Sequence, residues 1–202
     1  VLKELASFGP ELEDEMRRGG IHLDARARQR IRDYHEEASR SRLRECWGSW
    51  SGVEGEEEKM EAALSLLADF ESASWDQAAL SARLDALARE CRESHLDADP
   101  FQLAQFLFRL KHFQGVQTDY YHPDHSNLVA VIERRRGLPI SLALIYMLVG
   151  HRLGLAIEGC NFPGHFLARF SWQGKTILVD CFNGGVFLGE EDVARLGAEA
   201  LP

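Results

Sequence analysis

Three polar side chains in the last third of the chain have the types and the order of a nucleophile, a general base and an orienting acid. Ser141 lies in the first turn of an expected helix, where unpaired backbone N–H groups and the positive end of the helix dipole favour a developing anion. His165 and Asp180 follow on two segments with the composition of strands. If the three converge, they form a Ser-His-Asp triad, which suits hydrolysis or acyl transfer.

The element that must carry Ser141 is an almost wholly apolar helix. Pro139 suits its first turn, because the N–H that proline lacks would have no partner there. From Ile140 to Val149 nearly every position is apolar, so no face is left for water and the helix belongs in the middle of a domain. We expect it to end near Arg152-Leu153-Gly154.

The elements that must carry His165 and Asp180 are strands of a hairpin. Strands are expected over residues 155–160, 165–170 and 176–180. A four-residue loop would pair Ser171 with Thr176 and place His165 diagonal to Asp180, whereas a two-residue loop beginning at Trp172 would place them directly opposite. Side chains alternate along a strand, so both registers bring imidazole and carboxylate to one face, and an odd-length loop would separate them.

The amino-acid sequences of these segments resemble those of a known family. The stretches RRGLPISLALIY, RLGLAIEGCNFPGHFLARF and VDCFNGG, with YYHPDHSNLVAVIERRRG before them, are similar to the SirB-type branch of bacterial proteins in the transglutaminase-like, papain-related superfamily. The resemblance covers roughly residues 101–185 and extends more loosely back to about residue 56. It implies an α+β fold with a central buried helix packed on an antiparallel sheet, preceded by a helical N-terminal region.

In this resemblance the family's nucleophilic cysteine falls on Ser141, its histidine on His165 and its aspartate on Asp180. A thiol near a helix N-terminus and a histidine loses its proton readily, whereas a serine hydroxyl is far more basic. Attack by Ser141 would therefore need general-base removal of its proton. The resemblance also implies that serine here is a feature of the SirB-type branch.

Asn127 is a candidate for holding the oxyanion or positioning the substrate. It precedes the expected nucleophile helix, as a glutamine does in papain-like enzymes, and its amide is a suitable hydrogen-bond donor. Capping of a helix start is the alternative role for this residue.

The sequence predicts no cofactor and no metal site. His122 and His125 lie three positions apart with Asp124 between them, but no third ligand with suitable spacing is visible. The cysteines have no C-x-x-C spacing and are expected to be reduced thiols: Cys46, Cys91, Cys160 and Cys181.

Composition narrows the class of protein. The chain has 202 residues, 45% hydrophobic and 27% charged, which is typical of a globular protein. Its net charge of -9 argues against nucleic-acid binding, because phosphate contacts need a basic face. There is no apolar run of about 18 residues and no signal-peptide pattern at the start. We therefore expect a cytoplasmic protein that binds neither nucleic acid nor a membrane, while the oligomeric state stays open.

The expected organisation is a helical N-terminal arm and linker over residues 1–55 and a transglutaminase-like domain with its leading helices over 56–202. Asp24 should cap a helix that runs to Arg44, and the Gly- and Ser-rich stretch 48–55 should be the linker. Further helices are expected over 56–70, after a capping box at 74–77, from Asp99-Pro100, over 127–136 with Ser126 as cap, and from Glu190.

Three functions are consistent with this pattern. The favoured one is a pseudoenzyme that binds a peptide or protein segment in a preserved Ser/His/Asp pocket without transglutaminase activity, because the pocket of this fold suits a thiolate. The second is a serine-dependent amide or ester hydrolase in which Ser141 attacks, His165 is the base and acid, and Asp180 orients His165. The third is a structural interaction module in which the three side chains only stabilise the core.

Overall fold

The computed structural model describes residues 25–72, 78–94, 99–162, 164–189 and 192. Within it the chain forms two units, residues 1–79 and 80–202. Three predicted features lie outside the described residues: the N-cap Asp24, the capping box 74–77 and, apart from residue 192, the short helix from Glu190. The domain boundary expected after residue 55 stays a prediction.

The first unit consists of helices in its described part. Helix α3 (Ala25–Cys46) is followed by the 3-10 helix η2 (Trp47–Gly52) and by α4 (Glu56–Ser72), which starts with three glutamates at the positive end of its dipole. Most of the predicted linker is therefore helical. The rings of Trp47 and Trp50 pack edge to face with their centroids 6.3 Å apart, and the Ser51 hydroxyl donates to the Gly48 carbonyl at 2.7 Å. Local contacts therefore stabilise this segment.

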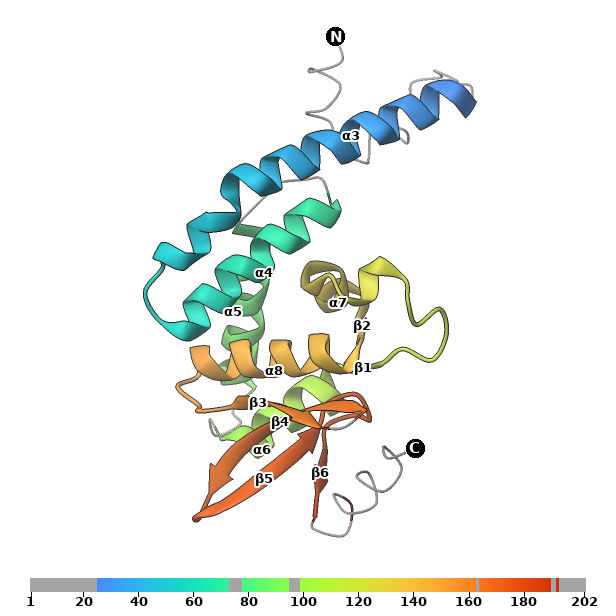
Figure 1. The fold of residues 1–202 in the computed structure, drawn as a ribbon. Helices are drawn as coiled ribbons and strands as arrows, with labels where there is room; N and C mark the ends of the chain where they lie inside the picture. Colours follow the sequence, from blue (N-terminus) through green and yellow to red (C-terminus); the bar gives the residue numbers. More distant parts are fainter. Residues whose placement is uncertain (1–24, 73–77, 95–98, 163, 190–191, 193–202) are drawn as a thin grey trace. The chain divides into compact units, whose positions relative to one another are not determined.

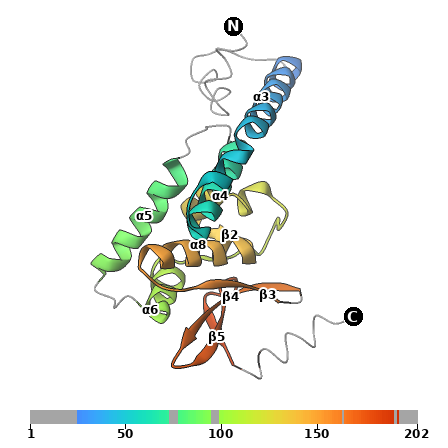
Figure 2. The ribbon, with the colours of Figure 1, turned by 60° about the vertical axis from the view of Figure 1, so that its left-hand side comes forward.

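The second unit contains a four-stranded antiparallel sheet. Its strands lie in chain order: β3 (Glu158–Phe162), β4 (His165–Trp172), β5 (Lys175–Asp180) and β6 (Val186–Leu188). Helix α8 (Pro139–Arg152) lies across this sheet in Figures 1 and 2 and packs on β3 and β4. The predicted α+β fold, with a central buried helix on an antiparallel sheet, is confirmed.

This unit contains further helices. They are α5 (Ala78–Glu93), whose first two residues belong to the first unit, α6 (Pro100–Ala104), the π-helical turn η3 (Gln105–Leu110) and α7 (Leu128–Arg134). Both α6 and α7 contact α8. Tyr146 of α8 is fully buried, and its hydroxyl donates to the Pro100 carbonyl at 2.7 Å. None of the described helices is long and apolar enough to cross a bilayer.

The β4–β5 hairpin settles the register. Ser171 pairs with Thr176 and Trp172 with Lys175. The predicted register that pairs Ser171 with Thr176 is therefore confirmed, and the register that places His165 directly opposite Asp180 is wrong. Gln173 and Gly174 form the turn with φ of 49° and 77°. Left-handed conformation at both central residues matches the twist of the flanking strands.

Several short elements were not predicted from the sequence. Strand β6 and the parallel pair β1 (Gln114–Gly115) and β2 (Arg136–Gly137) are too short for alternation to reveal. Strand β2 also takes the end of the helix predicted over 127–136, because Arg135 adopts a left-handed conformation with φ 58° and stops α7. The cap of α7 is Asn127 and not Ser126, whose hydroxyl donates to the Pro123 carbonyl at 2.8 Å.

Candidate functional site

His165 and Asp180 are in direct contact, with His165 Nε2 2.9 Å from Asp180 Oδ1. The Asp180 side chain is buried and also accepts hydrogen bonds from Asn183, at 3.1 Å from its backbone N–H and at 2.7 Å from its Nδ2. Because Nε2 of the imidazole faces the carboxylate, Nδ1 is the ring nitrogen left for another partner. The hairpin therefore supplies an imidazole whose orientation is held by an acid.

The protonation of Asp180 follows from these contacts. Burial raises the pKa of the carboxyl group, but the hydrogen bonds from His165 and Asn183, together with the charge of His165, outweigh burial and hold the pKa below its ordinary value. Asp180 is therefore ionised near neutral pH. Asn183 was not predicted as a site residue, although an aspartate followed three residues later by Asn-Gly-Gly is a turn signal that indicates a bond between side chain and backbone.

Ser141 faces a different partner. It is 1% exposed in the first turn of α8, and its hydroxyl donates to the His125 carbonyl at 2.9 Å. His125 ends the 3-10 turn η4 (Pro123–His125), and its carbonyl also accepts from the Leu138 N–H at 3.1 Å. Within the described part of the chain no hydrogen bond joins Ser141 to His165. The structure thus pairs two of the three predicted triad residues and ties the third to a loop.

The start of α8 keeps the anion-favouring character that the sequence predicts. The N-cap residue Leu138 provides no side-chain hydrogen bond, and Pro139 occupies the first turn. Backbone N–H groups in this turn lie at the positive end of the helix dipole. Gly137 lies close to this turn, because a Cβ added to it would come 3.4 Å from Cβ of Ser141 and 2.8 Å from a methyl group of Val131.

Asn127 caps α7 with its side-chain oxygen. Its Oδ1 accepts hydrogen bonds from the N–H groups of Val129 and Ala130 at 3.0 and 3.2 Å. This is the helix-start alternative of the sequence analysis. A role of Asn127 in holding an oxyanion or a substrate stays a prediction.

The histidine-rich turn before α7 has local contacts. Nδ1 of His122 accepts from the Asp124 N–H at 3.2 Å, and the Asp124 carboxylate forms an ion pair with Arg134. No cluster of three or more metal-ligating side chains occurs among the residues that the structure describes. The four cysteines are free thiols, and burial first, then the charge of Asp180, raises the pKa of the Cys181 thiol, so this residue is a poor nucleophile.

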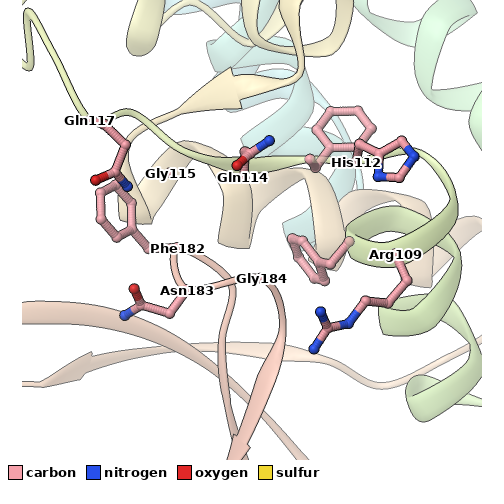
Figure 3. Close-up of a pocket in the computed structure, with 10 residues that line it drawn as sticks. Arg109, His112, Gln114, Gly115, Gln117, Phe182, Asn183 and Gly184 are labelled. Atoms are coloured by element: carbon pink, nitrogen blue, oxygen red, sulfur yellow. The ribbon is translucent and has the colours of Figure 1, made fainter.

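A cavity of about 460 Å³ is shown in Figure 3, and two of its lining residues contact the His165–Asp180 pair. It is lined by Phe108, Arg109, His112, Phe113, Gln114, Gly115, Gln117, Phe182, Asn183 and Gly184. The rings of Phe182 and His165 meet edge to face at 6.1 Å, and Asn183 donates to Asp180. The cavity wall is therefore continuous with the site, a link that the sequence analysis did not predict.

The chain is similar to known proteins over part of its length. A UPF0162 protein of Xylella fastidiosa (strain Temecula1) is 42% identical over 101 residues, which are 48% of this chain and 36% of the relative. F-box only protein 21 of Mus musculus is 38% identical over 71 residues, 35% of this chain and 11% of that protein. The matched region thus spans about a third of the UPF0162 relatives. No solved structure gives a significant match. The family model of the transglutaminase-like superfamily matches residues 78–201, more than half of the chain, and the chain therefore belongs to this superfamily.

Proposed function

We propose that this chain is a SirB-type transglutaminase-like domain that binds a peptide or protein segment beside the His165–Asp180 pair and carries out no acyl transfer. The observation that carries the proposal is the hydrogen bond from Ser141 to the His125 carbonyl. A serine nucleophile must pass its proton to a base during attack. A backbone carbonyl is not such a base, and the Ser141 hydroxyl has almost no contact with solvent.

The rest of the site suits recognition of a peptide. The His165 side chain is 16% exposed and is held by Asp180 through Nε2, so Nδ1 can hydrogen-bond a ligand. Gln114, Gln117 and Asn183 add amide groups to the cavity, and amides pair with the N–H and C=O groups of a peptide backbone. A volume of about 460 Å³ is within the range of ligand pockets and accommodates a few side chains.

A serine-dependent hydrolase is the second candidate. The observation in its favour is the imidazole oriented by an ionised carboxylate, which is the arrangement of a general base. This function requires the Ser141 hydroxyl to leave the His125 carbonyl and to reach Nδ1 of His165.

Two measurements on the full chain separate these candidates. A fluorophosphonate probe reports an activated serine, with Ser141→Ala and His165→Ala as matched variants. An array of short random peptides reports binding, and mass spectrometry shows whether bound peptides are cleaved or modified.

The proposal expects no labelling, intact bound peptides, and weaker binding by His165→Ala than by a His151→Ala control, since His151 is exposed near the end of α8. Labelling that disappears in both site variants would replace the binding function with the hydrolase. Far-ultraviolet circular dichroism checks that each variant is folded.

A further inference from the structure

One side of the cavity in Figure 3 carries a cation, Arg109, and no carboxylate lines the cavity among the residues that the structure describes. Arg109 lies in the last turn of η3, is exposed, and lines the cavity. The described residues that line the cavity include no aspartate or glutamate. From this we infer that the cavity selects peptide segments that bear a carboxylate, with Arg109 as the group that binds it. The inference rests on the proposed function and names the chemical class of its ligand.

Arg109 lacks the carboxylate partner that half of the other described arginines of this unit have. Four other arginines of this unit form ion pairs with carboxylates: Arg83, Arg134, Arg152 and Arg169. Among the described residues Arg109 has no ion pair, although the chain as a whole has a net charge of -9. A planar guanidinium matches a carboxylate with two parallel hydrogen bonds, so its ligand of choice is an acidic group.

The backbone that carries Arg109 is irregular. In η3 the N–H of Lys111 donates to the Phe106 carbonyl at 2.8 Å, five residues back, where an α-helix would reach only four. His112, which also lines the cavity, has a positive φ of 59°, a conformation that non-glycine residues adopt rarely. Such irregular turns are common at functional sites because they re-aim side chains. Here they carry Arg109 and His112 on one side of the cavity, as Figure 3 shows.

The opposite side offers apolar contact. The Phe182 ring lies against Gly115, since a Cβ added to that glycine would come 2.5 Å from the ring. Phe182 also meets Tyr120 edge to face at 6.5 Å, and Tyr120 meets Tyr121, which is 93% exposed, at 5.4 Å. This aromatic row runs from the cavity to the surface. A peptide segment that has a carboxylate to bind Arg109 and adjacent apolar side chains to pack on these aromatic rings would match both sides of the cavity.

The test uses fluorescent peptides taken from binders on the array and made in matched sets that differ only by Glu, Gln or Lys at one position. Fluorescence anisotropy gives their affinities for the full-length wild type, for Arg109→Gln and for Arg109→Glu. The matched control is Arg89→Glu, since Arg89 is an exposed arginine of α5 outside the cavity.

We expect the wild type to prefer the Glu peptide over the Gln peptide by about two- to fivefold, the range for one exposed ion pair. Arg109→Gln should abolish the preference and Arg109→Glu should reverse it in favour of Lys, while Arg89→Glu should leave it unchanged. Added salt should weaken the preference, because Arg109 is exposed.

Equal affinity of the wild type for Glu and Gln peptides, or an unchanged preference in Arg109→Gln, would overturn this inference and leave the proposed function intact. Binding of no peptide of any charge would overturn both. Inorganic phosphate and a matched phosphoserine peptide complete the set. If they bind more tightly than the Glu peptide, and only with Arg109 present, the ligand class is a phosphate and the carboxylate assignment is wrong.

Discussion

Replacing Asp180 with alanine is expected to lower the free energy of unfolding of the second unit by about 3–5 kcal/mol, as for removal of one partner of a buried charged network. The Asp180 side chain is 3% exposed and accepts three hydrogen bonds, from His165 Nε2 and from N and Nδ2 of Asn183. Each bond to a charged acceptor is worth about 1.5–3 kcal/mol, and the three share one acceptor group and are not additive. Asp180→Asn retains the shape and one oxygen acceptor, so its loss should be about 1–2 kcal/mol.

The effect of Asp180 should depend on pH in one direction. Its pKa is lowered in the folded state, so ionisation of Asp180 stabilises the fold above the ordinary aspartate pKa, and this stabilisation disappears as the pH falls through the folded-state value. The difference in stability between wild type and Asp180→Asn should therefore be constant above about pH 5 and shrink below about pH 4.

Urea denaturation of the full chain, followed by circular dichroism, measures these differences, and amide hydrogen exchange in β4 and β5 assigns the loss to the second unit. Asp85→Ala is the matched control: this aspartate pairs with Arg152 but its side chain is 62% exposed, so its loss should cost less than about 1 kcal/mol. A loss of less than about 1 kcal/mol for Asp180→Ala, or a pH-independent difference between wild type and Asp180→Asn from pH 3 to 7, would refute the reasoning.

Three further predictions concern buried groups near the site. Ser141→Ala should cost about 1 kcal/mol or less in urea denaturation, because the His125 carbonyl keeps a second donor; a loss above about 3 kcal/mol would contradict this. Tyr146→Phe should cost about 1–2 kcal/mol in the same assay, since it removes the fully buried hydroxyl that donates to Pro100, and an unchanged midpoint would show that this bond contributes nothing. Cys181 should resist iodoacetamide in the native protein and react in urea, because burial and the adjacent carboxylate raise the pKa of its thiol; native labelling located by mass spectrometry would argue against this burial.

The hairpin and the central helix were predictable because their signals are local. Alternation along a strand decides which side chains share a face, so either even-length loop brings His165 and Asp180 together. The choice between the two loops depended on Gln173 and Gly174, whose left-handed conformations make the tight turn. The run from Ile140 to Val149 is almost wholly apolar, which predicts a helix in the interior of the domain, and most of its side chains are buried although Ile140 is exposed.

Capping and short strands were harder to predict. Ser126 and Asn127 are both good caps by residue type, and the backbone at Asn127 decided which of them bonds to the first turn of α7. Strands β1 and β2 have two residues each, and their pairing joins segments far apart in the chain, so no local pattern announces them.

The sequence by itself determined the residue types of the site, their order, the central helix and the shared face of His165 and Asp180, because these follow from backbone periodicity. Only the tertiary structure decided that the Ser141 hydroxyl meets the His125 carbonyl, that Asn183 joins Asp180, and that a cavity opens beside them. Those contacts depend on where loops from distant parts of the chain come to rest against α8 and the sheet. Tertiary packing determines the positions of these loops, and the periodicity of the sequence does not predict them.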